Sequence, residues 1–196
     1  YKGETHDYPL QNDNPFILRD YNKCILCRRC TRACDEINGV EAIGLLDRGF
    51  DTKVGTPYDG SLVDSPCEFC GMCVELCPTG ALLPRQAQGS GRSWELQTTT
   101  TICPYCGVGC SLDLHTKDNR IVKASSNWDG AANHGVTCVK GRFGWDYVQN
   151  EERFTTPLIK KDGQFVEASW DEALDLVADR MVAIAKEHGP DALAFL

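Results

Sequence analysis

"CILCRRCTRAC" at residues 24–34 and "CEFCGMCVELCP" at residues 67–78 carry eight of the twelve cysteines of this 196-residue chain. Both stretches space their cysteines identically, and each cysteine of the second lies 43 residues after its counterpart in the first. Because a repeated set of four ligand-type side chains implies a repeated binding site, the sequence predicts two equivalent sites.

Three chemistries use cysteines at such short spacings. Disulfides need an oxidising environment, and four cysteines within eleven residues do not easily pair with one another without strain. A structural zinc ion takes two C-x-x-C pairs, which leaves an awkward surplus ligand in each run. The C-x-x-C-x-x-C-x-x-x-C-P spacing is the pattern of bacterial ferredoxins, so we favour two 4Fe-4S clusters over zinc and disulfides.

The fourth cysteine of each run is expected to bind the cluster of the other run, as it does in two-cluster ferredoxins. One predicted cluster is therefore held by Cys24, Cys27, Cys30 and Cys77, and the other by Cys67, Cys70, Cys73 and Cys34. Pro78 follows the second run as the pattern requires, whereas Asp35 stands where the first run would have its proline. Residues 1–86 thus resemble a bacterial-type ferredoxin domain, with a hairpin expected at residues 42–46 and 52–54.

The two runs differ in the charge of their neighbours. Basic side chains flank the first run and acidic ones flank the second: Lys23, Arg28, Arg29 and Arg32 against Asp64, Glu68 and Glu75. Nearby positive charge stabilises an added electron, which leads to the hypothesis that the Cys24 cluster has the higher reduction potential. The alternative is that these charges form a solvated, screened face.

A third set of cysteines consists of Cys103, Cys106, Cys110 and Cys138. It follows residues 87–101, which are rich in Gln, Gly, Ser and Thr and are expected to form a linker. No cysteine remains to exchange with this set, so its site must be self-contained. Residues 111–126 alternate as two strands around a turn at 118–119, and such a hairpin would return the distant Cys138 to the other three. We favour a third 4Fe-4S cluster, with a tetrahedral zinc ion as the alternative.

The region around and after Cys138 resembles a known family. Its sequence is "NHGVTCVKGRFGWDYVQNEERFTTPLIKKDGQFVEASWDEALDLV", which is similar to the N-terminal region of molybdopterin-dependent oxidoreductases, specifically formate dehydrogenase catalytic subunits. The resemblance covers residues 102–196 and implies a 4Fe-4S domain at 102–157, followed at 158–196 by the beginning of the molybdopterin oxidoreductase catalytic domain. The preceding ferredoxin module is the kind of extension seen in larger formate dehydrogenases and in the related subunit of respiratory complex I.

The resemblance also implies roles for individual residues. Lys140 matches the family lysine that relays electrons between the cluster and the pterin, and Arg142 is a weaker candidate of the same kind. The family's metal-bound cysteine or selenocysteine and its catalytic histidine and arginine are expected beyond Leu196, so no catalytic residue is assigned in this chain.

The expected function follows from the same resemblance. The full-length protein would bind Mo- or W-bis-molybdopterin guanine dinucleotide in addition to three 4Fe-4S clusters, and would interconvert formate and carbon dioxide. Its partners would be iron–sulfur or flavin subunits linked to NAD, ferredoxin or a hydrogenase. The alternative is a non-catalytic electron-relay subunit of the complex I type.

The expected fold class is α+β: a small ferredoxin-like two-cluster domain, a β-hairpin-rich 4Fe-4S domain and the start of an α/β molybdopterin-binding domain. Ser169 and Glu172 form a capping box before a helix. The apolar stripe of this helix is expected to be core: Trp170, Leu174, Val177, Met181 and Ile184. "DALAFL" at residues 191–196 is expected to begin a buried strand. The four histidines are scattered and are assigned no catalytic role: His6, His115, His134 and His188.

Composition narrows the possible partners. The formal net charge of −8 argues against nucleic acid and anionic lipid. No run of about 18 apolar residues is present, so no membrane span is expected. The chain begins at Tyr1 with no visible targeting peptide, and we expect it to be a cytoplasmic fragment of a longer protein.

Overall fold

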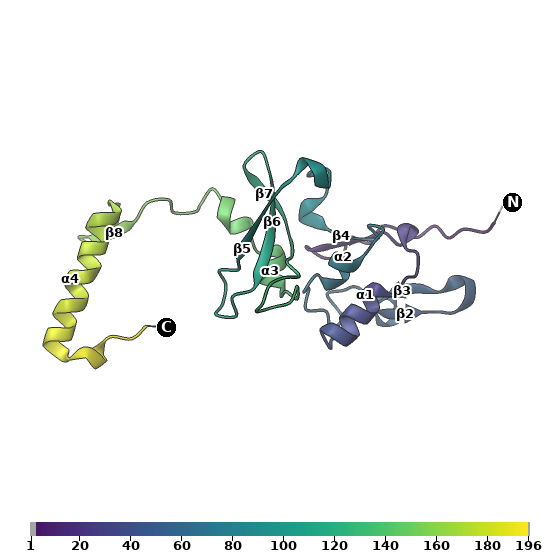
Figure 1. The fold of residues 1–196 in the computed structure, drawn as a ribbon, viewed down its shortest axis with the longest axis horizontal. Helices are drawn as coiled ribbons and strands as arrows, with labels where there is room; N and C mark the ends of the chain where they lie inside the picture. Colours follow the sequence, from purple (N-terminus) through teal and green to yellow (C-terminus); the bar gives the residue numbers. More distant parts are fainter. Residues whose placement is uncertain (1–2, 196) are drawn as a thin grey trace. The chain divides into compact units, whose positions relative to one another are not determined.

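The computed structural model describes residues 3–195 and divides the chain into two units, one up to residue 149 and one from residue 150 onward. Helices and short strands are mixed in both units, and the expected α+β class is confirmed (Figure 1). None of the helices in the described part is long and apolar enough to cross a bilayer.

The ferredoxin-like part of the first unit is closed by strands from its two ends. Strand β1 (Ile17–Arg19) pairs antiparallel with β4 (Leu82–Pro84), and Leu18 lies opposite Leu83. A second antiparallel pair, β2 (Gly44–Leu46) with β3 (Lys53–Gly55), confirms the hairpin that was expected between the two cysteine runs. The ladder between β1 and β4 joins segments that are more than sixty residues apart in the sequence. Both cysteine runs lie in the stretch of chain between these two strands.

Each cysteine run contributes one short helix. Helix α1 (Arg29–Arg32) continues into a π-helical turn (Ala33–Ile37), and α2 (Met72–Leu76) occupies the equivalent position in the second run. Several further turns are 3₁₀ helices: Tyr21–Lys23, Gly49–Asp51, Pro57–Asp59, Arg85–Ala87, Ser93–Glu95, Asp146–Gln149 and Pro190–Ala192.

The apolar core of the first unit is shared between the ferredoxin-like part and the residues after it. Ile17, Val54 and Leu82 are buried, and they belong to one cluster with Phe143 from α3 (Val139–Phe143). The ring of Phe143 stacks on that of Phe16 with the centroids 5.0 Å apart. Since a buried aromatic side chain contributes a large share of core burial, this contact fixes the third cysteine region against the ferredoxin-like part.

A three-stranded antiparallel sheet carries the third cysteine set. Its order is β5 (Gln97–Ile102), β6 (Ser111–Lys117) and β7 (Arg120–Ser126). The hairpin between β6 and β7 is confirmed, and Asp118 and Asn119 at its turn have φ values of 51° and 60°, as a tight hairpin turn requires.

The prediction of a linker at residues 87–101 is wrong for the last five of these residues, which belong to β5. This strand has no apolar alternation because most of its side chains are exposed and polar. Its threonines instead pair across the sheet. Thr98 Oγ1 lies 3.0 Å from His115 Nδ1, and Thr100 Oγ1 donates to Asp113 Oδ1 at 2.7 Å. β-Branched residues favour strands even where the pattern is polar throughout.

The second unit consists of a hairpin and one long helix. Strands β8 (Leu158–Lys161) and β9 (Gln164–Glu167) pair antiparallel, and α4 runs over Trp170–His188. The side chain of Ser169 accepts a hydrogen bond from the backbone N–H of Glu172 at 3.1 Å, so the expected N-terminal cap is confirmed.

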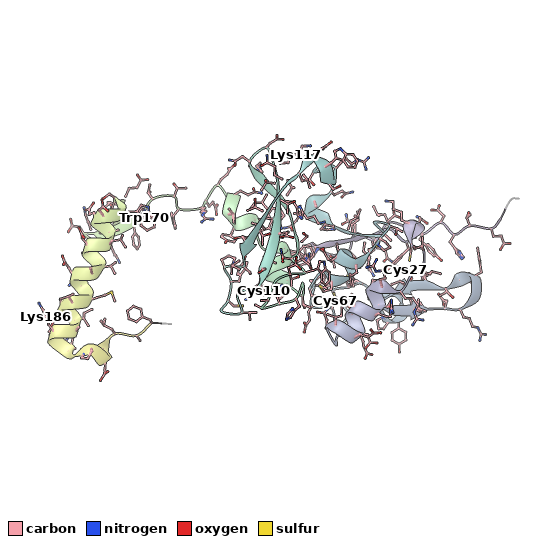
Figure 2. The ribbon with its side chains drawn as sticks, in the orientation of Figure 1. Cys27, Cys67, Cys110, Lys117, Trp170 and Lys186 are labelled. Atoms are coloured by element: carbon pink, nitrogen blue, oxygen red, sulfur yellow. The ribbon has the colours of Figure 1, made fainter. Side chains whose placement is uncertain are left out.

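Two expectations for this unit are wrong. The helix has no buried residue, and its apolar stripe is exposed, with Trp170 67% and Leu174 59% accessible. Figure 2 labels Trp170 at the start of this helix. A two-stranded hairpin is too small to provide a second layer that would cover the stripe. The residues expected to begin a strand form a 3₁₀ helix at Pro190–Ala192, and Phe195 is 82% exposed. No partner strand pairs with this stretch in the described part of the chain, and Leu196 lies outside it.

Candidate iron–sulfur sites

The first cavity is bordered by Cys24, Cys27, Cys30 and Cys77, which come from both cysteine runs. Tyr21, Val54 and Leu82 form apolar parts of its wall. Its volume, counted with adjoining solvent, is about 360 Å³. Cys27 lies on the exposed side of the site, whereas Cys30 is buried. Figure 2 labels Cys27, Cys67 and Cys110, one cysteine from each set.

The second cavity is bordered by Cys34, Cys67, Cys70 and Cys73. Its volume, counted in the same way, is about 380 Å³, and Ile17, Ile43 and Leu62 contribute to its wall. The two cavities therefore match in size, in the number of thiols and in apolar character. In each of them, three thiols come from one run and one thiol from the other.

The backbone repeats with the cysteines. Leu26 and Phe69 occupy equivalent positions, each has a positive φ (54° and 52°), and each donates its N–H to the sulfur two residues earlier at 3.4 Å. Arg28 and Gly71 are equivalent as the left-handed residues that precede α1 and α2. Bulky residues with positive φ are strained, and such strain concentrates at binding sites. The loops are thus bent so that amide donors face the sulfurs.

Burial changes the acidity of several of these thiols. It raises the pKa of Cys30 to about 11, and it raises the pKa of Cys67, Cys70 and, most strongly, Cys73. Cys77 differs: burial alone would raise its pKa, but backbone hydrogen bonds from Thr79 and its neighbours outweigh burial and lower it. Metal centres bind thiolates, so loading these sites releases protons.

The third cysteine set is assembled from three segments. Cys103 follows β5, Cys110 precedes β6, and Cys138 is the N-terminal cap residue of α3. The N–H of Cys103 donates to the carbonyl of Cys110 at 2.8 Å. Burial and the charges of Cys103, Cys106 and Cys138 all raise the pKa of Cys110.

Asn133 holds the returning loop in place. Its side chain accepts from the N–H of Ser111 at 2.9 Å and donates to the carbonyls of Val136 and Ser111 at 2.8 and 3.3 Å. The residue is 9% exposed. The approach to Cys138 is therefore tied to the residue that follows Cys110. The cysteine spacing alone gives no indication of this role.

Lys140 lies beside the third set. It is exposed, and it borders a small cavity together with Cys103, Tyr105 and Trp145. Its ammonium group makes no hydrogen bond or ion pair within the described residues. An exposed cation near Cys103 is placed where it can meet an anionic or polar group of a bound cofactor.

Arg142, in contrast, is buried, and both of its terminal nitrogens have partners. It is 3% exposed, and its Nη1 lies 2.6 Å from Glu75 Oε2, which flanks the second cysteine run. The sequence indicates basic neighbours for the first cysteine run and acidic neighbours for the second. The ion pair reduces this difference, because it neutralises the charge of Glu75. Lys23 is likewise paired, with Asp20 at 2.7 Å. The hypothesis that the Cys24 cluster has the higher potential thus loses part of its basis.

The donor sets of the first two sites fit iron–sulfur clusters. Four thiols border a cavity in each of them, and four thiols are the donor set of a 4Fe-4S cluster. The assignment of particular cysteines to particular clusters stays a prediction.

Comparisons with protein families match three consecutive segments. Residues 14–83 match the ferredoxin-like domain of NADH-quinone oxidoreductase subunit 3, and residues 96–150 match the molybdopterin oxidoreductase Fe4S4 domain. Residues 153–196 match the molybdopterin oxidoreductase family. The chain thus has the domain content of the N-terminal portion of a molybdopterin oxidoreductase.

Two kinds of curated relative are similar to the chain. It is 40% identical over 177 residues to a subunit of NADH-quinone oxidoreductase from Rhizobium meliloti, a match that covers 90% of this chain and 20% of that protein. It is 34% identical over 235 aligned positions to a "Putative formate dehydrogenase" from Staphylococcus aureus (strain USA300), covering 98% and 24%. The chain spans between a fifth and a quarter of the length of these relatives.

Proposed function

We propose that this chain is the electron-transferring iron–sulfur portion of a formate dehydrogenase. The observation that carries the proposal is the presence of three cysteine quartets in one chain, with an exposed lysine beside the third. Formate would be oxidised to carbon dioxide, one proton and two electrons at a molybdenum or tungsten bis-pterin centre elsewhere in the full-length protein. A 4Fe-4S cluster carries one electron at a time, so several clusters in series suit this two-electron reaction.

The proposed ligands are those expected from the sequence. Cys24, Cys27, Cys30 and Cys77 hold one cluster; Cys67, Cys70, Cys73 and Cys34 hold the next; Cys103, Cys106, Cys110 and Cys138 hold the third. The cysteine groups that border the first two cavities support the first two assignments. Total iron and acid-labile sulfide near twelve each per chain is the expected result. Stoichiometric zinc would contradict all three assignments.

The contacts between sites suggest an order of transfer. The hydroxyl of Thr137, adjacent to Cys138, donates to the carbonyl of Cys70 at 3.1 Å. The third set therefore adjoins the second cavity, and in our proposal electrons pass from the Cys103 cluster to the Cys67 cluster and then to the Cys24 cluster. From there they leave to an iron–sulfur or flavin subunit linked to NAD, ferredoxin or a hydrogenase. We also propose that the protein acts in the cytoplasm.

Lys140 is proposed to couple the third cluster to the pterin. In the full-length protein, Lys140→Gln should leave the cluster absorption unchanged and slow its bleaching by formate by about tenfold or more. Lys186→Gln, a change of the same charge on the exposed surface of α4, is the matched control. Equal bleaching rates for Lys140→Gln and wild type would contradict the role of Lys140.

A second function is favoured by one observation, the 40% identity to a subunit of NADH-quinone oxidoreductase. In that case the chain relays electrons without chemistry of its own. Analysis of the full-length protein for molybdenum, tungsten and pterin separates the two functions. A pterin-bound metal together with formate-dependent bleaching supports the dehydrogenase, whereas the absence of both metals eliminates it.

A further inference from the structure

Arg142 occupies an unusual position between two of the cysteine sites. It belongs to α3, four residues after Cys138, and its guanidinium reaches Glu75 in α2, two residues from Cys73 and from Cys77. A second nitrogen, Nη2, donates to Ser126 Oγ at the end of β7 at 2.6 Å. One buried side chain therefore joins three elements that belong to both cysteine regions.

The same side chain lies against the second cavity. A Cβ added at Gly71, the residue after Cys70, would be 2.6 Å from Arg142 Cγ and 3.0 Å from its Nε. That Nε is buried and has no hydrogen-bond partner within the described residues. This donor is therefore buried, unpartnered and next to cysteines proposed to bind a cluster. A bound anionic cluster would interact favourably with its positive charge.

We propose that buried Arg142 and its partly buried partner Glu75 form a charge pair that sets the reduction potential of the cluster in the second cavity. The proposal rests on the cluster-binding part of the proposed function and is independent of the substrate. Reduction adds one negative charge to a cluster, and a buried cation favours that state while a nearby, partly buried carboxylate opposes it. Exposed charges such as Arg32 are screened by water and salt and act more weakly.

The test is a redox titration of the purified holoprotein followed by electron paramagnetic resonance, which resolves the clusters separately. Arg142→Gln should raise the ratio of oxidised to reduced second cluster at a fixed potential by about tenfold, which is about 59 mV for a one-electron couple. Glu75→Gln should shift the same cluster in the opposite direction. The double variant Arg142→Gln/Glu75→Gln should return close to wild type.

Arg32→Gln serves as the matched control, because it removes an exposed cation near the first run and should change either ratio by no more than about twofold. Shifts of the same sign in both single variants would overturn the proposal, since a merely structural pair has no reason to move the potential in opposite directions. If Arg142→Gln fails to retain its cluster, Glu75→Gln alone decides: an unchanged potential overturns the proposal. Absence of formate activity leaves these shifts unaffected, so the two proposals fail separately.

Discussion

Replacing Gly71 with alanine perturbs the closest approach between the second cysteine run and the third cysteine region. Gly71 has φ +74°, and the added Cβ would lie 2.6 Å from Arg142 Cγ. Arg142 cannot give way easily, because its side chain is 2% exposed and its guanidinium is held by Glu75 and Ser126. The substitution therefore adds a steric clash to the cost of a left-handed alanine.

Gly80 offers a matched control with almost the same backbone. Its φ is +72°, but its nearest neighbour to an added Cβ is Leu83 Cδ2 at 3.5 Å, an ordinary contact. A left-handed alanine costs about 1–2 kcal/mol. Overpacking at Gly71 adds about 1–3 kcal/mol. The difference between the two variants thus isolates the contact with Arg142.

The assay is thermal loss of the visible cluster absorption from anaerobically purified protein, at one scan rate for all variants. For a chain of this size, 1 kcal/mol shifts the midpoint by about 2–4 °C. We expect Gly80→Ala to lower the midpoint by about 2–8 °C and Gly71→Ala by about 4–20 °C, with a clear gap measured side by side. Equal midpoints for the two variants would refute the argument that Arg142 is fixed against Gly71.

Three further predictions follow from individual contacts. Cys77→Ser should abolish the same paramagnetic signal as Cys24→Ser, while Cys34→Ser should abolish the signal lost in Cys67→Ser; loss within each run instead would disprove the exchange of fourth ligands. Asn133→Ala removes three hydrogen bonds of a buried side chain and should destabilise the third site by about 1–3 kcal/mol, so that its signal is lost first on warming. Burial alone would raise the pKa of Asp13, but the hydrogen bond from Asn14 and the charge of Arg19 lower it below 3.8. The ion pair with Arg19, at 2.8 Å, therefore contributes stability above that pH and loses it as the pH falls through the folded-state pKa. Asp13→Asn should lower the free energy of unfolding at pH 6 by about 1–3 kcal/mol, and this difference should shrink as the pH falls toward the folded-state pKa of Asp13; a pH-independent difference would contradict the reasoning.

The cysteine spacing predicted much of the candidate site because it is a geometric requirement of the ligand. Regular spacing placed equivalent loops in both runs, and the structure repeats even the left-handed residues at Leu26 and Phe69. The hairpin turn at Asp118 and Asn119 was predictable for a similar local reason, since these residue types tolerate positive φ.

The features that the sequence did not reveal depend on contacts between distant residues. Glu75 appeared to be a surface acid beside a cysteine run, and only the fold shows that Arg142 neutralises it. The threonines of β5 resembled a linker, because their pairing with β6 depends on tertiary structure and not on an apolar period. The stripe on α4 is apolar enough to be core, but periodicity does not show whether a covering layer exists.

Because of Phe143, the two-cluster module depends structurally on the residues that follow it. The ring is 2% exposed and stacks on Phe16, and the side chain of Gln86 donates to its carbonyl at 3.0 Å. A polypeptide cut between residues 86 and 96 would expose to water the face of Phe16 on which that ring stacks. If this module were fused to another electron-transfer protein, that protein would have to cover the exposed aromatic surface with a bulky apolar side chain.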